Sequence, residues 1–177
     1  MTMEIEVTFL FIKEKDMIDK KLILICAACF LPGLCSSTEL AHQISQAGSS
    51  ASNVGSHATF TGKVRHDSIS RPDADSPYSV SYVTFEPGAR TFWHTHPAGQ
   101  RMLIVFGKGL IGDENGNVHV VRPGDNVWCP PGLKHWHGAA PDTAMVHMVI
   151  TNMKGGKNVT WMEEVSDKDY TMTPSNK

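Results

Sequence analysis

Two short clusters hold most of the side chains that could do chemistry. In the first, one residue separates His94 from His96, and Gln100 follows after a Pro-Ala-Gly turn. Positions i and i+2 of a strand share a face, so the two imidazoles can point the same way and the amide of Gln100 can return to the same point. In the second cluster, His135 and His137 repeat the spacing. The sequence therefore predicts one polar site built from two separate segments.

These side-chain types suit a divalent transition metal. Imidazole nitrogens and a neutral amide oxygen are ligands for Mn, Fe, Zn, Ni or Cu, and the absence of thiolates in the clusters argues against a closed structural zinc site. An open coordination position for a small-molecule substrate is expected. The chain has nine His among its 177 residues. His66 and His119 lie outside the clusters and are expected at the surface.

The elements that must position the clusters are short strands separated by turns. Runs that alternate between apolar and polar residues, or are apolar throughout, are bounded by Gly, Pro, Asn and Asp; they span residues 80–85, 102–106, 118–121, 126–129 and 144–150. Strands this short and evenly spaced favour an all-β fold, a small closed barrel or a double-sheet jelly roll, over alternating βαβ units. The tail at residues 161–170 is expected to pack outside as an extra strand or turn.

Composition restricts the possible partners. The formal net charge is −2, with 41% hydrophobic and 19% charged residues, which is typical of a globular domain. Without a basic excess, the electrostatic footprint of a nucleic-acid-binding protein is missing. Apolar runs such as residues 82–85 would be hazardous as uncovered sheet edges, so we expect a homo-oligomer, a dimer or tetramer.

The N-terminal segment has the order of a secretory signal. Basic Lys20-Lys21 precede an apolar run at residues 22–31, which is too short for the roughly 20 residues that span a bilayer, and small residues follow. We expect an over-extended start at residues 1–16, a signal peptide at residues 17–37, a flexible spacer at residues 38–57 and a folded domain at residues 58–172. Export to the periplasm is predicted; lipid anchoring and a buried N-terminal helix are the alternatives.

Cysteine usage agrees with a fold that does not depend on disulfides. Three of the four cysteines lie in the leader, which leaves Cys129 and at most Cys35 in a processed chain. Cys129 is expected to be a small buried hydrophobe and not a reactive thiol.

The two clusters resemble the two motifs of the cupin superfamily. The pattern is Gly88-x5-His94-x-His96-x3-Gln100-x6-Gly107, then Gly124-x5-Pro130-x-Gly132-x2-His135. Most cupins carry Glu where Gln100 stands, and Asn is common where Ala139 stands. With its Gln, the chain from about residue 58 to 170 is similar to small single-domain bacterial cupins that include the manganese-dependent (R)-selective hydroxynitrile lyases, which are mandelonitrile lyase-like.

This resemblance implies a fold, a metal site and an activity. The fold would be the cupin double-stranded β-helix, a single jelly-roll barrel. The ligands would be His94, His96, Gln100 and His135, with Mn ahead of Fe, Zn, Ni or Cu, and His147 would transfer a proton. His137 shares the inner face with His135 and could assist, whereas His147 could also be a satisfied core histidine.

Three functions from different classes remain open from the sequence. The first is a metal-dependent lyase that cleaves or forms a small cyanohydrin. An amide in place of a carboxylate leaves the metal its full charge, so it would be a stronger Lewis acid. The second is a dioxygenase-type oxidoreductase using Fe or Mn, and the third is a non-catalytic periplasmic module that binds a small ligand or metal. Fold alone does not separate them, because cupins host many chemistries.

Overall fold

The computed structural model describes residues 40–171. The chain divides into two units, residues 1–42 and residues 43–177, and every helix and strand named below belongs to the second. The predicted start and signal peptide, residues 1–37, lie outside the described residues, so export stays a prediction. Among the described residues, no helix is both long and apolar enough to cross a membrane.

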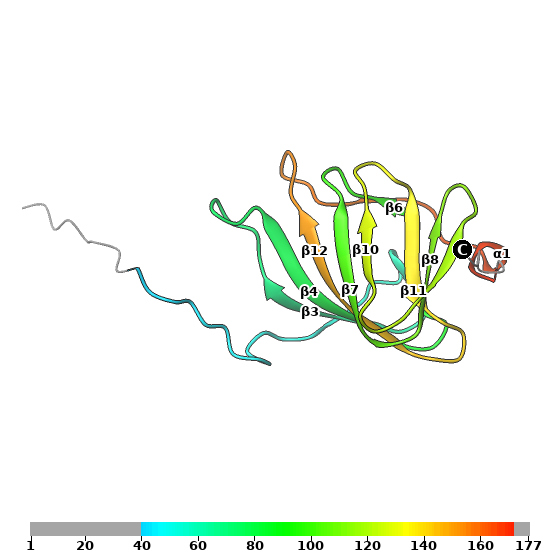
Figure 1. The fold of residues 1–177 in the computed structure, drawn as a ribbon, viewed down its shortest axis with the longest axis horizontal. Helices are drawn as coiled ribbons and strands as arrows, with labels where there is room; N and C mark the ends of the chain where they lie inside the picture. The colour runs from blue at the N-terminus through cyan, green and yellow to red at the C-terminus, as the bar shows by residue number, and fades with distance from the viewer. Residues whose placement is uncertain (1–39, 172–177) are drawn as a thin grey trace, which may run out of the picture. The chain divides into compact units, whose positions relative to one another are not determined.

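Within residues 40–171, the domain contains two antiparallel sheets and one short helix (Figure 1). The first sheet has six strands in the order β1 (Asn53–Val54), β3 (Val64–Ser70), β4 (Tyr78–Phe85), β12 (Met145–Asn152), β7 (Gln100–Gly107) and β10 (Asn126–Cys129). The second contains β13 (Thr160–Trp161), β6 (His94–Thr95), β11 (His135–Ala139), β5 (Arg90–Thr91) and β2 (Phe60–Thr61), with β8 (Gly109–Asp113) pairing with β11 and with β9 (Val118–Val121). The all-β, double-sheet prediction is confirmed.

Strict alternation along the first sheet determines what points inward. On β7, Gln100, Met102 and Ile104 are buried while the residues between them are exposed. On β12, all four odd-numbered positions from Met145 to Thr151 are buried. Since side chains alternate between the two faces of a strand, each strand contributes a single inward row.

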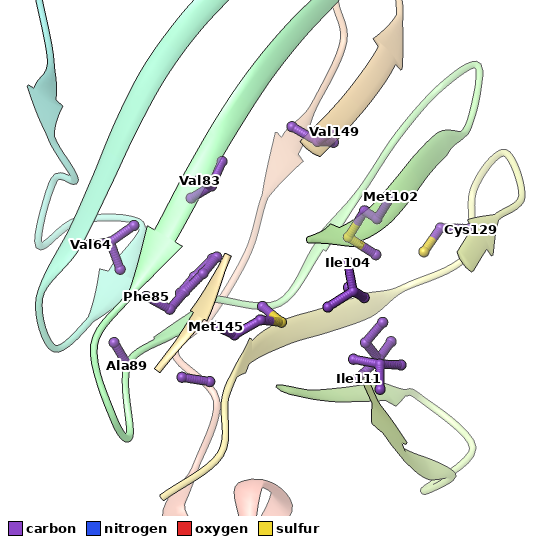
Figure 2. Close-up of a cluster of buried hydrophobic side chains, with 12 residues drawn as sticks. Val64, Val83, Phe85, Ala89, Met102, Ile104, Ile111, Cys129, Met145 and Val149 are labelled. Carbon is purple, nitrogen blue, oxygen red and sulfur yellow. The ribbon is translucent and has the colours of Figure 1, made fainter. Parts of the chain in front are cut away.

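The inward rows change character along their length. At one end, Phe85, Met102, Ile104 and Met145 form an apolar core that Figure 2 shows packed between the sheets. Further along β12, His147 and Thr151 replace aliphatic side chains at buried positions. One end of the barrel interior is therefore filled by apolar side chains, and the other end contains buried polar groups.

The C-terminal tail closes the outside of the second sheet. Strand β13 pairs with β6, and α1 (Asp167–Tyr170) follows. The Tyr170 hydroxyl donates to the carbonyl of Ala139 at 2.8 Å, and Arg90 contacts both the carbonyl of Val165 and the carboxylate of Asp167. This cover buries Trp136 of β11, which packs with Val165 and Tyr170. Strand β13 agrees with the expected extra strand.

Two expectations need correction. The sheet begins at β1, inside residues 38–57, which the sequence assigned to a flexible spacer; β1 pairs with β3. The reason given for self-association was also wrong, because β4 lies between β3 and β12 and is not an edge. A strand's neighbours depend on topology, which its own composition does not reveal. The homo-oligomer itself stays a prediction.

One turn makes a direct test of the fold. Gly107 ends β7 with φ of 77°, and a Cβ there would lie 1.7 Å from the carbonyl oxygen of Ala144, which accepts a hydrogen bond from the Lys108 N–H. Gly107→Ala should therefore lower the free energy of unfolding by more than about 3 kcal/mol, since backbone strain and overlap combine.

Gly88 supplies the matched control for this turn. It has φ of 79° and nothing within 4 Å of an added Cβ, so Gly88→Ala should cost only the left-handed strain, about 1–2 kcal/mol. Urea unfolding of both variants checks this. Equal losses would contradict the close approach at Gly107.

Candidate metal centre

Three imidazoles meet where the two sheets' polar ends converge. His94 on β6 and His135 on β11 are direct partners across the strands, and their ring centroids lie 4.3 Å apart. His96 follows β6, with its ring 5.0 Å from that of His94 and 5.5 Å from that of His135. All three are buried. The two sequence clusters are thus brought together, although β6 is only two residues long.

Backbone carbonyls fix the protonation of each ring. The Nδ1–H groups of His94, His96 and His135 donate to the carbonyls of Phe92, Asn158 and Leu133. A carbonyl can only accept, so Nδ1 must carry the hydrogen and the neutral ring keeps a lone pair on Nε2. Such an outer hydrogen bond is the usual support of a metal-binding histidine.

The atoms left without partners fit a metal ion. Among the buried side-chain atoms that lack a hydrogen bond are His96 Nε2, His135 Nε2 and Gln100 Oε1. All three are acceptors, and unpaired buried acceptors are costly unless something electropositive satisfies them. Three imidazole nitrogens and an amide oxygen are a donor set that Mn, Fe and Zn accept.

Burial keeps these rings neutral. Desolvation is the main cause that lowers the pKa of His135 to about 4, and it lowers the pKa of His96 and, more strongly, of His94, where neighbouring His135 and His96 add to the effect. Because a ligand must be unprotonated, the apolar surroundings prepare the rings for coordination at neutral pH.

A second pair of histidines lies beside the first group. His147 Nε2 and His137 Nδ1 are 3.2 Å apart, and both rings pack against Phe85, at 5.5 and 5.8 Å between centroids. Burial is the leading cause that lowers the pKa of both rings, for His147 to about 3. The outer atoms of the pair, His137 Nε2 and His147 Nδ1, have no partner, so the pair can take up or release a proton at either end.

One group of histidine nitrogens near enough to share a metal ion includes a residue with a different predicted role. Among the described His, Cys, Asp and Glu residues, the group whose ligand atoms all lie within 4.8 Å of one another is His94, His135 and His137. The sequence assigned His137 to proton transfer and His96 to the metal. The structure therefore places His137 near enough to His94 and His135 to act directly on anything bound between them.

A cavity opens next to these groups and reveals residues that the sequence did not single out. Its walls include apolar Phe60, Val83, Val149 and Trp161 and hydroxyl-bearing Ser79, Ser81, Thr91 and Thr151. His66 also lines it and is half-buried, so the surface expectation was wrong for His66 but right for exposed His119. His66 pairs with Val83 on β4, and the alternation of Val64, His66 and Ser68 was the available signal.

Comparisons of the sequence with a family model and with known proteins both identify relatives of this chain. A family model described as a cupin domain matches residues 81–151. An (R)-mandelonitrile lyase from Granulicella tundricola is 48% identical over 128 residues, 72% of this chain and 98% of that protein.

Solved structures show the same architecture. A cupin-like protein from Thermotoga maritima superposes with a TM-score of 0.64 at 36% identity, covering 70% of this chain and 94% of that one. A cupin 2 conserved barrel domain protein from Rhodopseudomonas palustris, with a TM-score of 0.54, 18% identity and coverage of 63% and 76%, supports the fold alone.

Metal content is the first test of the site. Protein purified without chelator from a metal-replete culture should carry one divalent transition metal ion per chain by elemental analysis. The variant His94→Ala/His96→Ala should lose it, because two ligands disappear. His119→Ala, at an exposed position on β9, is the control and should keep the metal. A metal-free parent, or a double variant that retains its metal, would contradict the assignment.

Acid should destabilise the metal-free domain. In the unfolded chain the buried histidines return to a pKa near 6.5, whereas burial holds His135 at about 4 and His147 at about 3. Between these values the unfolded chain binds more protons, so the free energy of unfolding falls as the pH drops from about 6.5 to about 4. The urea midpoint should follow, with a shallower slope in His147→Gln than in the exposed control His119→Gln. A midpoint independent of pH across this window would refute the prediction.

Proposed function

This chain belongs to the cupin family, and from that premise we propose that it is a metal-dependent lyase that cleaves or forms a small cyanohydrin-like hydroxy compound. The observation that carries the proposal is the buried His137–His147 pair, 3.2 Å between nitrogens, next to rings that present unpartnered Nε2 atoms. Its relative from Granulicella tundricola supports the choice of a mandelonitrile-type substrate.

The cavity supports a substrate with one polar and one apolar part. A hydroxyl group would face the imidazoles and Gln100, while a hydrocarbon substituent would lie against Phe60, Val149 and Trp161. The side chains of Ser79 and Ser81, which also line the cavity, could accept or donate further hydrogen bonds to the substrate. Such a mixture of apolar walls and few polar groups is usual in sites for small molecules.

His94, His96, Gln100 and His135 would hold the metal, for which we propose manganese. When bound, a divalent ion supplies Lewis acidity that polarises the substrate hydroxyl oxygen and makes its proton easier to remove. Since all four ligands are neutral, none of that charge is cancelled by the protein.

The histidine pair would move the proton. With His137 Nδ1–H donating to His147 Nε2, the free His137 Nε2 accepts the hydroxyl proton while the carbon–carbon bond breaks and its electron pair leaves with cyanide. The aldehyde remains, and the imidazolium returns the proton to cyanide, which leaves as hydrogen cyanide. Burial lowers the pKa of both rings, which favours this return because a buried imidazolium gives up its proton more readily than a free one.

Cleavage of mandelonitrile under anaerobic conditions tests the proposal. The manganese-loaded protein should release benzaldehyde and hydrogen cyanide without consuming oxygen. His137→Ala should lower kcat by about 10²–10⁴-fold, the usual contribution of a positioned acid–base group. His147→Ala should also lower kcat, because it removes the ring that holds the His137 Nδ1–H, whereas exposed His119→Ala should not. Turnover that depends on oxygen would favour the dioxygenase, and no turnover in any variant would favour the binding module.

A further inference from the structure

Gln100 creates an orientation problem that a carboxylate would not have. The two oxygens of a Glu ligand are equivalent, so either can bind a metal. An amide has one oxygen, which can coordinate, and one NH₂ group, which only donates hydrogen bonds. Half of the possible orientations of Gln100 would therefore aim two N–H groups at the cation. A neighbouring group must hold the NH₂ on the other side.

Thr151 stands where that group is needed. Gln100 opens β7 and Thr151 lies near the end of β12, and the two residues are direct partners across these adjacent strands (Figure 1). Each side chain is 5% exposed. The Nε2 of Gln100 donates to the hydroxyl of Thr151 at 3.4 Å, and its Oε1 is buried without a partner. The amide is thus held by its nitrogen, with its oxygen free.

We propose that Thr151 is a positioning residue that orients the Gln100 amide with Oε1 toward the metal. The inference rests on the metal centre of the proposed function. Thr151 is β-branched and lies in a strand, so its side chain has few rotamers and its hydroxyl stays in one place. When Oε1 binds a cation, the buried NH₂ still needs an acceptor, and within the described contacts the Thr151 hydroxyl supplies it.

Metal affinity distinguishes this role from simple packing. Thr151→Val keeps the shape of the side chain but removes the acceptor, whereas Thr151→Ser keeps the acceptor and loses a methyl group. We expect Thr151→Val to weaken Mn²⁺ binding about 10–100-fold, as losses of outer hydrogen bonds to ligands do. Thr151→Ser should stay within about threefold of the parent, and Thr84→Val, the same change at a half-buried position of β4, should not change affinity.

Repeating the Thr151 substitution in a variant that lacks the Gln100 amide makes the test specific to that amide. In Gln100→Glu the ligand has no NH₂ group, so adding Thr151→Val should cost little further affinity. A double-mutant cycle in Mn²⁺ affinity, measured on metal-free full-length protein by competition with a chelator, therefore isolates the coupling between the two side chains. Thermal unfolding of each metal-free variant shows whether all are folded.

The outcomes separate the inference from the function on which it rests. Wild-type affinity in Thr151→Val, or equal losses in the parent and Gln100→Glu backgrounds, would overturn the role of Thr151 while leaving the metal centre intact. A parent that binds no Mn²⁺ would overturn the proposed function and this inference together. Tight binding with the expected pattern but without cyanohydrin cleavage would support the inference and reject the lyase.

Discussion

Hydrogen bonds from histidine Nδ1 to backbone carbonyls are the constraint on which the site depends. In water a neutral imidazole exchanges its hydrogen between two nitrogens, but Phe92, Leu133 and Asn158 each offer only an acceptor. The rings of His94, His135 and His96 are therefore restricted to one tautomer, with Nε2 free. Because the apolar surroundings also oppose protonation, the fold itself produces a set of lone pairs directed at one region, before any metal binds.

The site lies in the barrel where the inward-facing side chains change from apolar to polar. The inward rows of the barrel begin with tightly packed aliphatic and aromatic side chains and end with imidazole, amide and hydroxyl groups. Phe85 lies at the boundary, in contact with both His137 and His147. The same packing that stabilises the domain thus also buries the histidine pair.

The sequence predicted those features that depend on local spacing. Strand β10 has the predicted bounds, residues 126–129, and the i, i+2 pairs at His94/His96 and His135/His137 are buried together. The sequence did not predict features that depend on residues far away in the chain. The carbonyl that holds His96 lies 62 positions further along the chain, and the interior place of β4 follows from strand order. Thr151 was not singled out and His66 was expected at the surface, because single polar residues at alternating positions resemble ordinary strand composition.

The anchor of His96 has a thermodynamic consequence for the C-terminal tail. Asn158, which accepts from that ring, lies just before β13, the strand that pairs with β6 beside His94. Release of this segment would free Nδ1 and allow the ring to change tautomer. The docked tail therefore favours the form of His96 that, in the proposed function, would bind a metal ion. Linkage is reciprocal, so any free energy that the docked segment would add to metal binding, a bound metal would add to docking of the segment. A bound ion would then stabilise the docked C-terminal segment. Metal binding would be visible as slower hydrogen exchange of the backbone amides in this segment, which lies far along the sequence from most of the proposed ligands.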